Sequence, residues 1–197
     1  MKQRALEIIL EQVKAFKSPS AELEQYRTPA IIAARLLHVA DLQGDIADRR
    51  VVDLGCGTGV LALGAALLGG VVTGVDSDER ALEIARANAK LLGAKVSWLK
   101  SSIEDFEGSY DTVVMNPPFG AQKRHSDRPF LRKAVSVGKV IYLLHNAVVN
   151  GFVRHFLEPH RVTDAIRVKL PIAHTFKFHK EEVRYVDAII YRIEVAH

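Results

Sequence analysis

The sequence predicts an α/β fold: a seven-stranded, mostly parallel sheet with helices on both faces and an antiparallel hairpin at one edge. Short apolar runs alternate with helical patterns along most of the chain, which is typical of parallel strands joined by helices. The last two apolar runs have no helical pattern between them, which favours a hairpin. A length of 197 residues with 48% hydrophobic and 25% charged residues suits one globular domain, residues 1–197.

The elements follow from the spacing of apolar residues. Strands are expected where short apolar runs end at glycine, proline or polar residues, namely at 50–54, 71–76, 95–99, 110–115, 138–144, 161–170 and 184–195. Helices are expected where apolar residues recur every three or four positions, namely at 2–17, 29–41, 59–68, 78–92, 128–136 and 146–157. Residues 1–45 thus form a helical extension ahead of the first strand.

Composition excludes several classes of protein. Cys56 is the only cysteine, so the chain has no internal disulfide and no cysteine-cluster zinc site, as suits a reducing, cytoplasmic location. The histidines show no metal-ligand spacing, and we expect no metal. The N-terminus mixes charges among its apolar residues, unlike a signal peptide. The long uncharged run between Asp53 and Asp76 contains too many glycines for a membrane span, so no membrane contact is expected.

A glycine-rich loop follows the first predicted strand. Gly55, Gly57 and Gly59 let the backbone approach a ligand just before a helix begins. A dinucleotide-binding fingerprint would need a third glycine where Val60 stands. The pattern D-x-G-x-G-x-G, from Asp53 to Gly59, instead resembles the signature of Rossmann-like class I methyltransferases that bind S-adenosyl-L-methionine. The resemblance implies that Asp53, Gly55 and Gly57 contact this cofactor.

The ends of the next two strands carry further candidate cofactor contacts. Asp76 ends the second strand, where a carboxylate can accept hydrogen bonds from both hydroxyls of a ribose, and Asp78 suits the cap of the following helix. After the third strand, Ser102 and the backbone of Ile103 are expected to face the adenine of the cofactor. Methyltransferases of this kind often have aspartate where Ser102 stands, so the sequence departs from the pattern there.

The fourth strand ends in Asn116, Pro117, Pro118 and Phe119. This run resembles the N-P-P-aromatic motif of enzymes that methylate a planar amine or amide nitrogen, and we interpret these four residues as catalytic. The lone pair of such a nitrogen is delocalised. The Asn116 side-chain oxygen and the Pro117 carbonyl can accept both N–H groups, because proline fixes the backbone and adds no competing donor. Asn116 also borders the cofactor, and Phe119 would stack on the target ring.

Motifs along almost the whole chain support a closer resemblance. In order, these are Glu24-Gln25-Tyr26-x-Thr28, Ile32-Ala33-Ala34-Arg35, the glycine loop, the NPPFG run and HTFKFHK. Together they resemble the methyltransferase-like family that makes N6-methyladenosine in small-subunit ribosomal RNA.

That family resemblance has two implications beyond the residues themselves. The segment before the first strand should lie over the methionine end of the cofactor, so that Gln25, Tyr26 and Thr28 contact it. A small zinc-binding activator protein should form a heterodimer with the chain at a sheet edge. A purely structural interpretation remains open for Thr28, which would cap a helix that begins at Pro29.

Two basic segments are candidate RNA contacts. The formal net charge is +4, and cations gather between residues 123 and 139, next to the NPPF run. The proposed RNA-binding residues are Lys123, Arg124, Arg128, Lys177, Phe178 and His179. Ordinary solvated charges and a hairpin tip would explain them equally well.

Three functions therefore remain open. The preferred function is methylation of adenosine N6 in RNA, most naturally ribosomal RNA. The alternatives are methylation of a protein glutamine amide, which the same acceptors could hold, and a non-catalytic RNA-binding or ribosome-assembly protein. The short extension before the glycine loop and the cations after Phe119 favour RNA.

Overall fold

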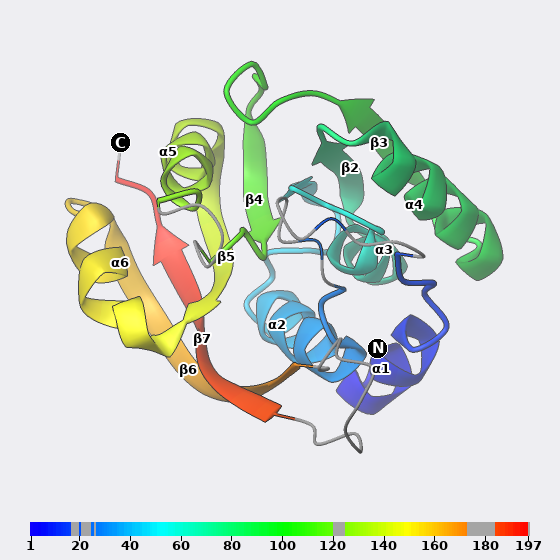
Figure 1. The fold of residues 1–197 in the computed structure, drawn as a ribbon, viewed down its shortest axis with the longest axis horizontal. Helices are drawn as coiled ribbons and strands as arrows, with labels where there is room; N and C mark the ends of the chain where they lie inside the picture. The colour runs from blue at the N-terminus through cyan, green and yellow to red at the C-terminus, as the bar shows by residue number, and fades with distance from the viewer. Residues whose placement is uncertain (17–19, 21–24, 26, 120–124, 173–183, 197) are drawn as a thin grey trace.

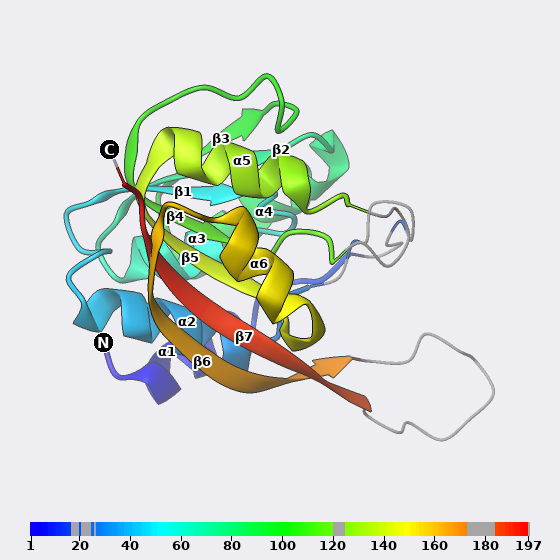
Figure 2. The same ribbon diagram turned by 90° about the vertical axis from the view of Figure 1, so that its left-hand side faces the viewer.

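Seven strands form one sheet with helices on both faces, as the sequence predicts (Figures 1 and 2). The computed structural model describes residues 1–16, 20, 25, 27–119, 125–172 and 184–196. The strand order is β3-β2-β1-β4-β5-β7-β6. Strands β1 to β5 run parallel, and β7 lies antiparallel between β5 and β6. The closing hairpin is therefore confirmed, with its second strand on the inner side.

The strands are β1 Arg50–Leu54, β2 Val71–Asp76, β3 Val96–Lys100, β4 Tyr110–Met115, β5 Gly138–Asn146, β6 Arg161–Ile172 and β7 Arg184–Glu194. The α-helices are α1 Gln3–Leu10, α2 Ala30–Leu42, α3 Val60–Leu67, α4 Glu79–Leu92, α5 Arg128–Val137 and α6 Asn150–Phe156. A 3₁₀ turn, η1 Ala147–Val149, joins β5 to α6. In the part of the chain that the structure describes, no helix has both the length and the apolar character needed to cross a membrane.

The first helix is shorter than the predicted range of 2–17. It ends at Leu10, and the backbone of Lys14 instead bonds to helix α4. The Lys14 amide donates to Asn88 Oδ1 (2.9 Å), and Asn88 Nδ2 donates to the Lys14 carbonyl (3.1 Å). A buried side-chain amide thus replaces the helical partners of Lys14 and ties the N-terminal segment to the domain.

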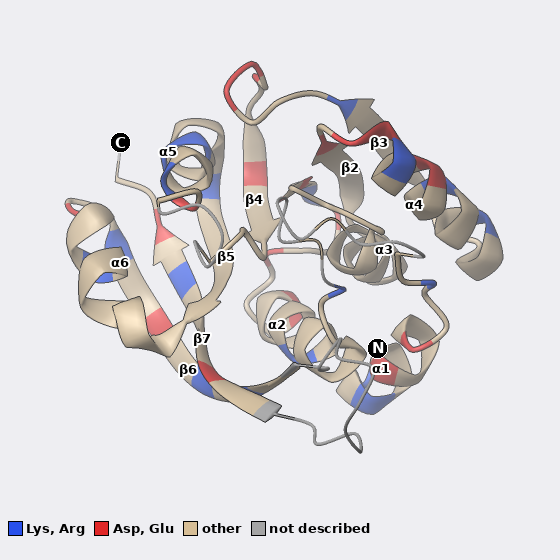
Figure 3. Cartoon of the chain, viewed as in Figure 1, with Lys and Arg blue, Asp and Glu red and all other residues tan. Residues whose placement is uncertain are grey.

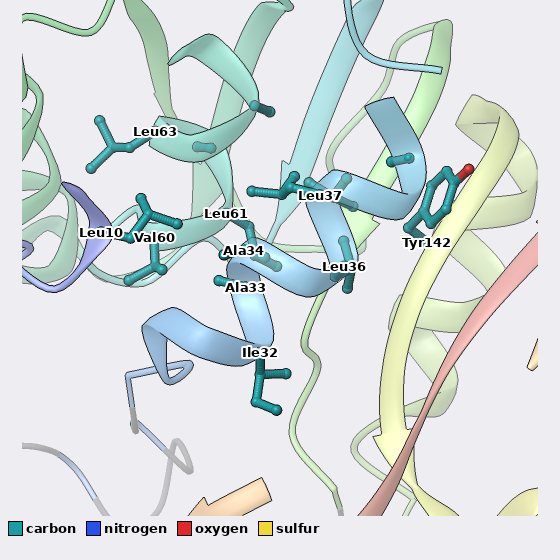
Figure 4. Packing of buried hydrophobic residues seen from close by; sticks show 14 of the residues in the cluster. Leu10, Ile32, Ala33, Ala34, Leu36, Leu37, Val60, Leu61, Leu63 and Tyr142 are labelled. Carbon is teal, nitrogen blue, oxygen red and sulfur yellow. The ribbon is translucent and has the colours of Figure 1, made fainter. Parts of the chain in front are cut away.

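Alternation along the strands divides the core between the two faces. One cluster joins α2 to α3 and to the sheet, with Tyr142 of β5 at its border (Figure 4). The other packs α5 and α6 against the opposite face. In β4, Val114 belongs to the first cluster and Met115 to the second.

The parallel strands also bring the residues at their carboxyl ends together. Because β1 to β5 are parallel, their carboxyl ends meet at one edge of the sheet, where ligands of open α/β sheets bind.

Candidate active site

A cavity of about 340 Å³ lies at the carboxyl edge of the parallel strands. Its wall comes from the segment before α2, from the loops after β1, β2, β3 and β4, and from the start of α5. Predicted site residues in this wall are Gln25, Gly55, Gly57, Asp76, Ser102, Ile103, Asn116, Pro117 and Pro118. The structure therefore brings together residues that the sequence spreads over more than ninety positions.

The glycine loop closes tightly around the cavity floor. Gly55 and Gly57 have φ angles of +71° and +52°, which residues other than glycine rarely adopt. A Cβ atom on Gly55 would lie 2.8 Å from the Phe130 ring, and one on Gly57 would lie 3.3 Å from the Phe16 ring. The backbone conformation favours glycine at both positions, and at Gly55 a Cβ atom would also clash with the Phe130 ring.

Asp53 lies beneath the start of α3, in a second cavity of about 40 Å³. Thr28 and Asn116 share this cavity. Asp53 Oδ2 accepts a hydrogen bond from the Ala62 amide (2.9 Å), and burial raises the pKa of the carboxyl group to about 7. The buried Asp53 carboxyl group, next to the glycine loop, therefore holds a proton more readily than an ordinary aspartate does.

Asp76 braces the glycine loop. Its Oδ2 accepts from the Gly57 amide (2.8 Å) and its Oδ1 from the Asp78 amide (2.9 Å). Burial raises the pKa of Asp76, although these amide bonds oppose the shift.

Asp78 caps helix α4, as predicted, by accepting from the Arg80 amide. Its other oxygen, Oδ2, accepts from Gln25 Nε2 (2.7 Å). This contact fixes Gln25 beside the cavity.

Ser102 and Ile103 line the opposite wall, after β3. The Ser102 hydroxyl donates to Asp105 Oδ2 (2.7 Å) and accepts from the Asp105 amide (3.1 Å). The hydroxyl proton is therefore already used, and only acceptor capacity remains for a ligand. The adenine contact stays a prediction.

Asn116 presents an unsatisfied oxygen. Its Nδ2 donates to Thr28 Oγ1 (2.9 Å), while its buried Oδ1 has no hydrogen-bond partner among the described residues. A buried polar atom without a partner costs stability, so a bound donor would satisfy it.

The alternative prediction, that Thr28 caps a helix beginning at Pro29, is wrong. Helix α2 begins at Ala30, with Pro29 in the cap position, and the cap makes no side-chain hydrogen bond. The Thr28 hydroxyl accepts from Asn116 instead, so this side chain serves the end of β4.

Pro117 and Pro118 line the cavity, whereas Phe119 does not. The half-buried Phe119 ring stacks on the His145 ring, with centroids 5.3 Å apart and planes 18° apart. A base held by this ring would therefore lie at the rim of the cavity.

Sequence reasoning missed the pair behind Phe119. His145, at the end of β5, and Asp127, just before α5, are both buried. His145 Nδ1 accepts from the Asn146 amide (2.9 Å), so Nε2 carries the ring proton and donates to Asp127 Oδ2 (3.1 Å). Burial lowers the pKa of His145, which keeps the ring neutral. The two residues belong to no motif.

Further wall residues also went unpredicted, among them Phe16, Ser126 and Phe130. Phe16 and Phe130 follow the apolar pattern of helices, which gave no reason to separate them from core residues. Ser126 Oγ is buried without a hydrogen-bond partner among the described residues. No signal in the sequence distinguishes it.

Of the candidate RNA contacts, the structure describes only Arg128. Its guanidinium lies over the Phe152 ring, 5.1 Å from the centroid. Helix α5, which carries several cations, packs on the same face of the sheet as α6 (Figure 3). Tyr26, Lys123, Arg124, Lys177, Phe178 and His179 lie outside the described residues.

Known proteins resemble the chain along its whole length. The methyltransferase small domain family matches residues 32–137. The rRNA N(6)-adenosine-methyltransferase METTL5 of Danio rerio is 35% identical, with 92% of this chain and 93% of that protein covered. The Drosophila melanogaster counterpart is 32% identical, with 99% and 97% covered.

A solved structure also resembles the chain over its whole length. A candidate RNA methyltransferase from Pyrococcus horikoshii is 38% identical, covers 100% of this chain and 99% of its own, and superposes with a TM-score of 0.90. The matched region contains the glycine loop, Asp76 and the NPPF run. On these grounds the chain belongs to the methyltransferase small domain family and, with the METTL5 proteins, to the rRNA N6-adenosine methyltransferases.

Proposed function

We propose that this chain methylates the N6 amine of an adenosine in ribosomal RNA, using S-adenosylmethionine. One observation carries the chemistry: Asn116 Oδ1 is a buried acceptor without a partner among the described residues, at the end of β4 and directly before Pro117. The named activity of relatives that align over almost the whole chain supports the choice of adenosine.

The cavity fits the cofactor. Its volume of about 340 Å³ lies in the usual range of small-molecule sites, and the two positive-φ glycines leave room for close approach. Asp76 would hold the ribose side, Ser102 and Ile103 the adenine, and Gln25, Thr28 and Asp53 the methionine end. When bound, S-adenosylmethionine supplies a methyl group on a positively charged sulfur.

The chain itself supplies acceptors. An adenosine amine is a weak nucleophile because its lone pair is delocalised into the ring. Asn116 Oδ1 and the Pro117 carbonyl would each accept one N–H bond, which favours the pyramidal amine whose lone pair is free. Both acceptors are fixed before the substrate binds, Asn116 by Thr28 and Pro117 by its own ring.

The glutamine alternative uses the same acceptors, because a side-chain amide also carries two N–H bonds on a planar nitrogen. It lacks the support that the relatives give to adenosine. The retained acceptors also weigh against a non-catalytic protein.

The proposal includes a heterodimer with a small zinc-binding activator. Strand β3 lies at the end of the strand order, and Leu99 on it is 44% exposed. An unpaired strand edge with apolar side chains is suited to pairing with a partner strand. A reducing, cytoplasmic location, inferred from the single cysteine and the ribosomal substrate, belongs to the same proposal.

A labelling experiment tests the function. The chain, alone and with a candidate activator, is incubated with labelled S-adenosylmethionine and either unmethylated small-subunit ribosomal RNA or total protein. We expect N6-methyladenosine in the RNA, identified by mass spectrometry of its nucleosides. Label in protein glutamine, with none in RNA, would overturn the proposal.

A further inference from the structure

Ser126, like Asn116, is a wall residue whose polar side-chain atom lacks a partner. The Ser126 hydroxyl oxygen is buried and makes no hydrogen bond within the described residues, as is true of Asn116 Oδ1. Both residues line the cavity of about 340 Å³. Buried polar atoms are nearly always hydrogen-bonded, so two such atoms on one cavity point to a bound molecule that satisfies both.

The backbone around Ser126 is held at two points. Ser126 lies in a turn that is closed by a hydrogen bond from the Arg128 amide to the His125 carbonyl (3.2 Å), directly before helix α5. The next residue, Asp127, accepts from His145 near the end of β5 (3.1 Å). These bonds fix the position of the hydroxyl oxygen, while the hydroxyl hydrogen can still rotate toward a ligand.

The strand order favours the substrate side of the cavity for Ser126. The proposed cofactor contacts Asp53, Asp76 and Ser102 lie at or just after the ends of β1, β2 and β3. Asn116, the proposed acceptor for the amine, follows β4. The segment of Ser126 is tied to β5, which lies on the other side of β4 from those three strands. A ligand of Ser126 is therefore more naturally the substrate than the cofactor.

We infer that Ser126 binds the target base: its hydroxyl donates a hydrogen bond to a ring nitrogen on one side of the adenine amine, either N1 or N7. The inference rests on the proposed function for the identity of that base. Both ring nitrogens accept hydrogen bonds and cannot donate them in neutral adenine. A hydroxyl can donate to such an atom while Asn116 Oδ1 accepts from the amine, so the two side chains match an acceptor and a donor on one base.

Ser126→Ala, which removes only the hydroxyl group, tests the contact. We expect kcat/KM on unmethylated small-subunit ribosomal RNA to fall about tenfold, as for one hydrogen bond to the substrate, and Ser126→Thr to retain most of the rate. Affinity for S-adenosylmethionine, measured by calorimetry, should stay unchanged. A matching loss of cofactor affinity in Ser126→Ala would assign the hydroxyl to the cofactor and overturn the inference.

Ser136→Ala is the matched control with no expected effect on kcat/KM. Ser136 is exposed on α5, and its hydroxyl donates to the Lys133 carbonyl (2.8 Å).

Thermal unfolding separates a substrate contact from a structural role. Because the structure gives Ser126 Oγ no partner among the residues it describes, its removal costs the fold no hydrogen bond. The Tm of Ser126→Ala should therefore equal or exceed that of the wild type. A lower Tm together with lower activity would show that the hydroxyl supports the fold, and would overturn the inference.

Base analogues identify the contacted atom. RNA fragments are synthesised around the methylated adenosine, once mass spectrometry of RNA digests has located it, with adenosine, 1-deazaadenosine or 7-deazaadenosine at that position. We expect one analogue to reduce kcat/KM about tenfold more in the wild type than in Ser126→Ala, and the other to reduce it equally in both proteins. Equal reductions in both proteins for both analogues would overturn the inference. RNA left unlabelled by the wild type would instead refute the proposed function, and the inference with it.

Discussion

The Asn116 side-chain amide donates to the Thr28 hydroxyl at 2.9 Å, across 88 residues of sequence. This bond joins the segment before α2 to the end of β4. Because it uses the nitrogen of the amide, the oxygen is the atom left for a ligand. In this arrangement Thr28 holds the nitrogen of Asn116, and the oxygen remains for a bound donor.

Removal of the Thr28 hydroxyl should therefore reduce turnover. We expect Thr28→Val to lower kcat roughly tenfold, since the amide can then turn and present its nitrogen, a loss similar to one hydrogen bond to the reacting group. Thr28→Ser, which keeps the hydroxyl, should retain most of the rate. Steady-state kinetics with ribosomal RNA measures both, and a loss in Thr28→Ser with none in Thr28→Val would show that the methyl group of Thr28, not its hydroxyl, matters.

Asn116→Ala should have a larger effect. Loss of a preorganised polar contact to the reacting group typically costs about 100- to 1000-fold in kcat. Calorimetry should find affinity for S-adenosylmethionine close to that of the wild type, because the proposed cofactor contacts lie mainly on other residues. A parallel loss of binding and turnover would contradict the assignment of Asn116 to the amine.

Asp76→Ala should weaken cofactor binding first. The change removes the proposed ribose contact and also frees the Gly57 amide that Asp76 holds. Asp111→Ala is a matched control, since Asp111 accepts from the Arg50 amide at the opposite, amino-terminal end of the parallel strands. Similar affinities for the two variants would remove Asp76 from the cofactor site.

Thermal stability without cofactor should depend on Asp53. An ordinary aspartate has a pKa of 3.8, and burial raises the pKa of Asp53 to about 7 in the fold. Between these values the folded chain binds more protons at this site than the unfolded chain, so the free energy of unfolding falls as pH rises from about 4 to about 7.

The matched variant is Asp53→Asn, whose amide oxygen can still accept from Ala62. It should show a smaller fall in Tm over the same range in calorimetric scans. The remaining slope includes Asp76, whose pKa burial also raises. Identical slopes for the two proteins would show that Asp53 stays ionised in the fold.

Arg128 provides a test of the RNA path. If it contacts a phosphate, Arg128→Gln should reduce the slope of log affinity against log salt by about one. Arg86→Gln on α4 is the control, because Arg86 pairs with Glu79 on an exposed helix face. An unchanged slope for Arg128→Gln would remove this residue from the interface.

The fold could be predicted from local patterns, because the spacing of apolar residues that distinguishes strands from helices is visible over a few neighbouring residues. The carboxyl ends of β1, β2 and β4 could be assigned for the same reason, since Asp53, Asp76 and Asn116 lie at or next to the ends of strands of clear apolar character. The cap at Asp78 involves residues only two apart.

Contacts between distant segments were not predictable in this way. The bond between Thr28 and Asn116 depends on how α2 packs, and a local helix rule gave Thr28 the wrong role. Helix α1 ended early because Asn88, far along the chain, takes over the backbone of Lys14. The pair of Asp127 and His145 follows from the packing of α5 beside β5, which no spacing encodes.

The strand order has a consequence for how the protein is made. Among the described strands, β6 pairs only with β7, and β7 joins it to β5. A nascent chain that has left the ribosome through β6 thus carries a strand with no neighbour and an open margin on β5. Assembly of that half of the molecule must wait until the residues up to Glu194 have emerged.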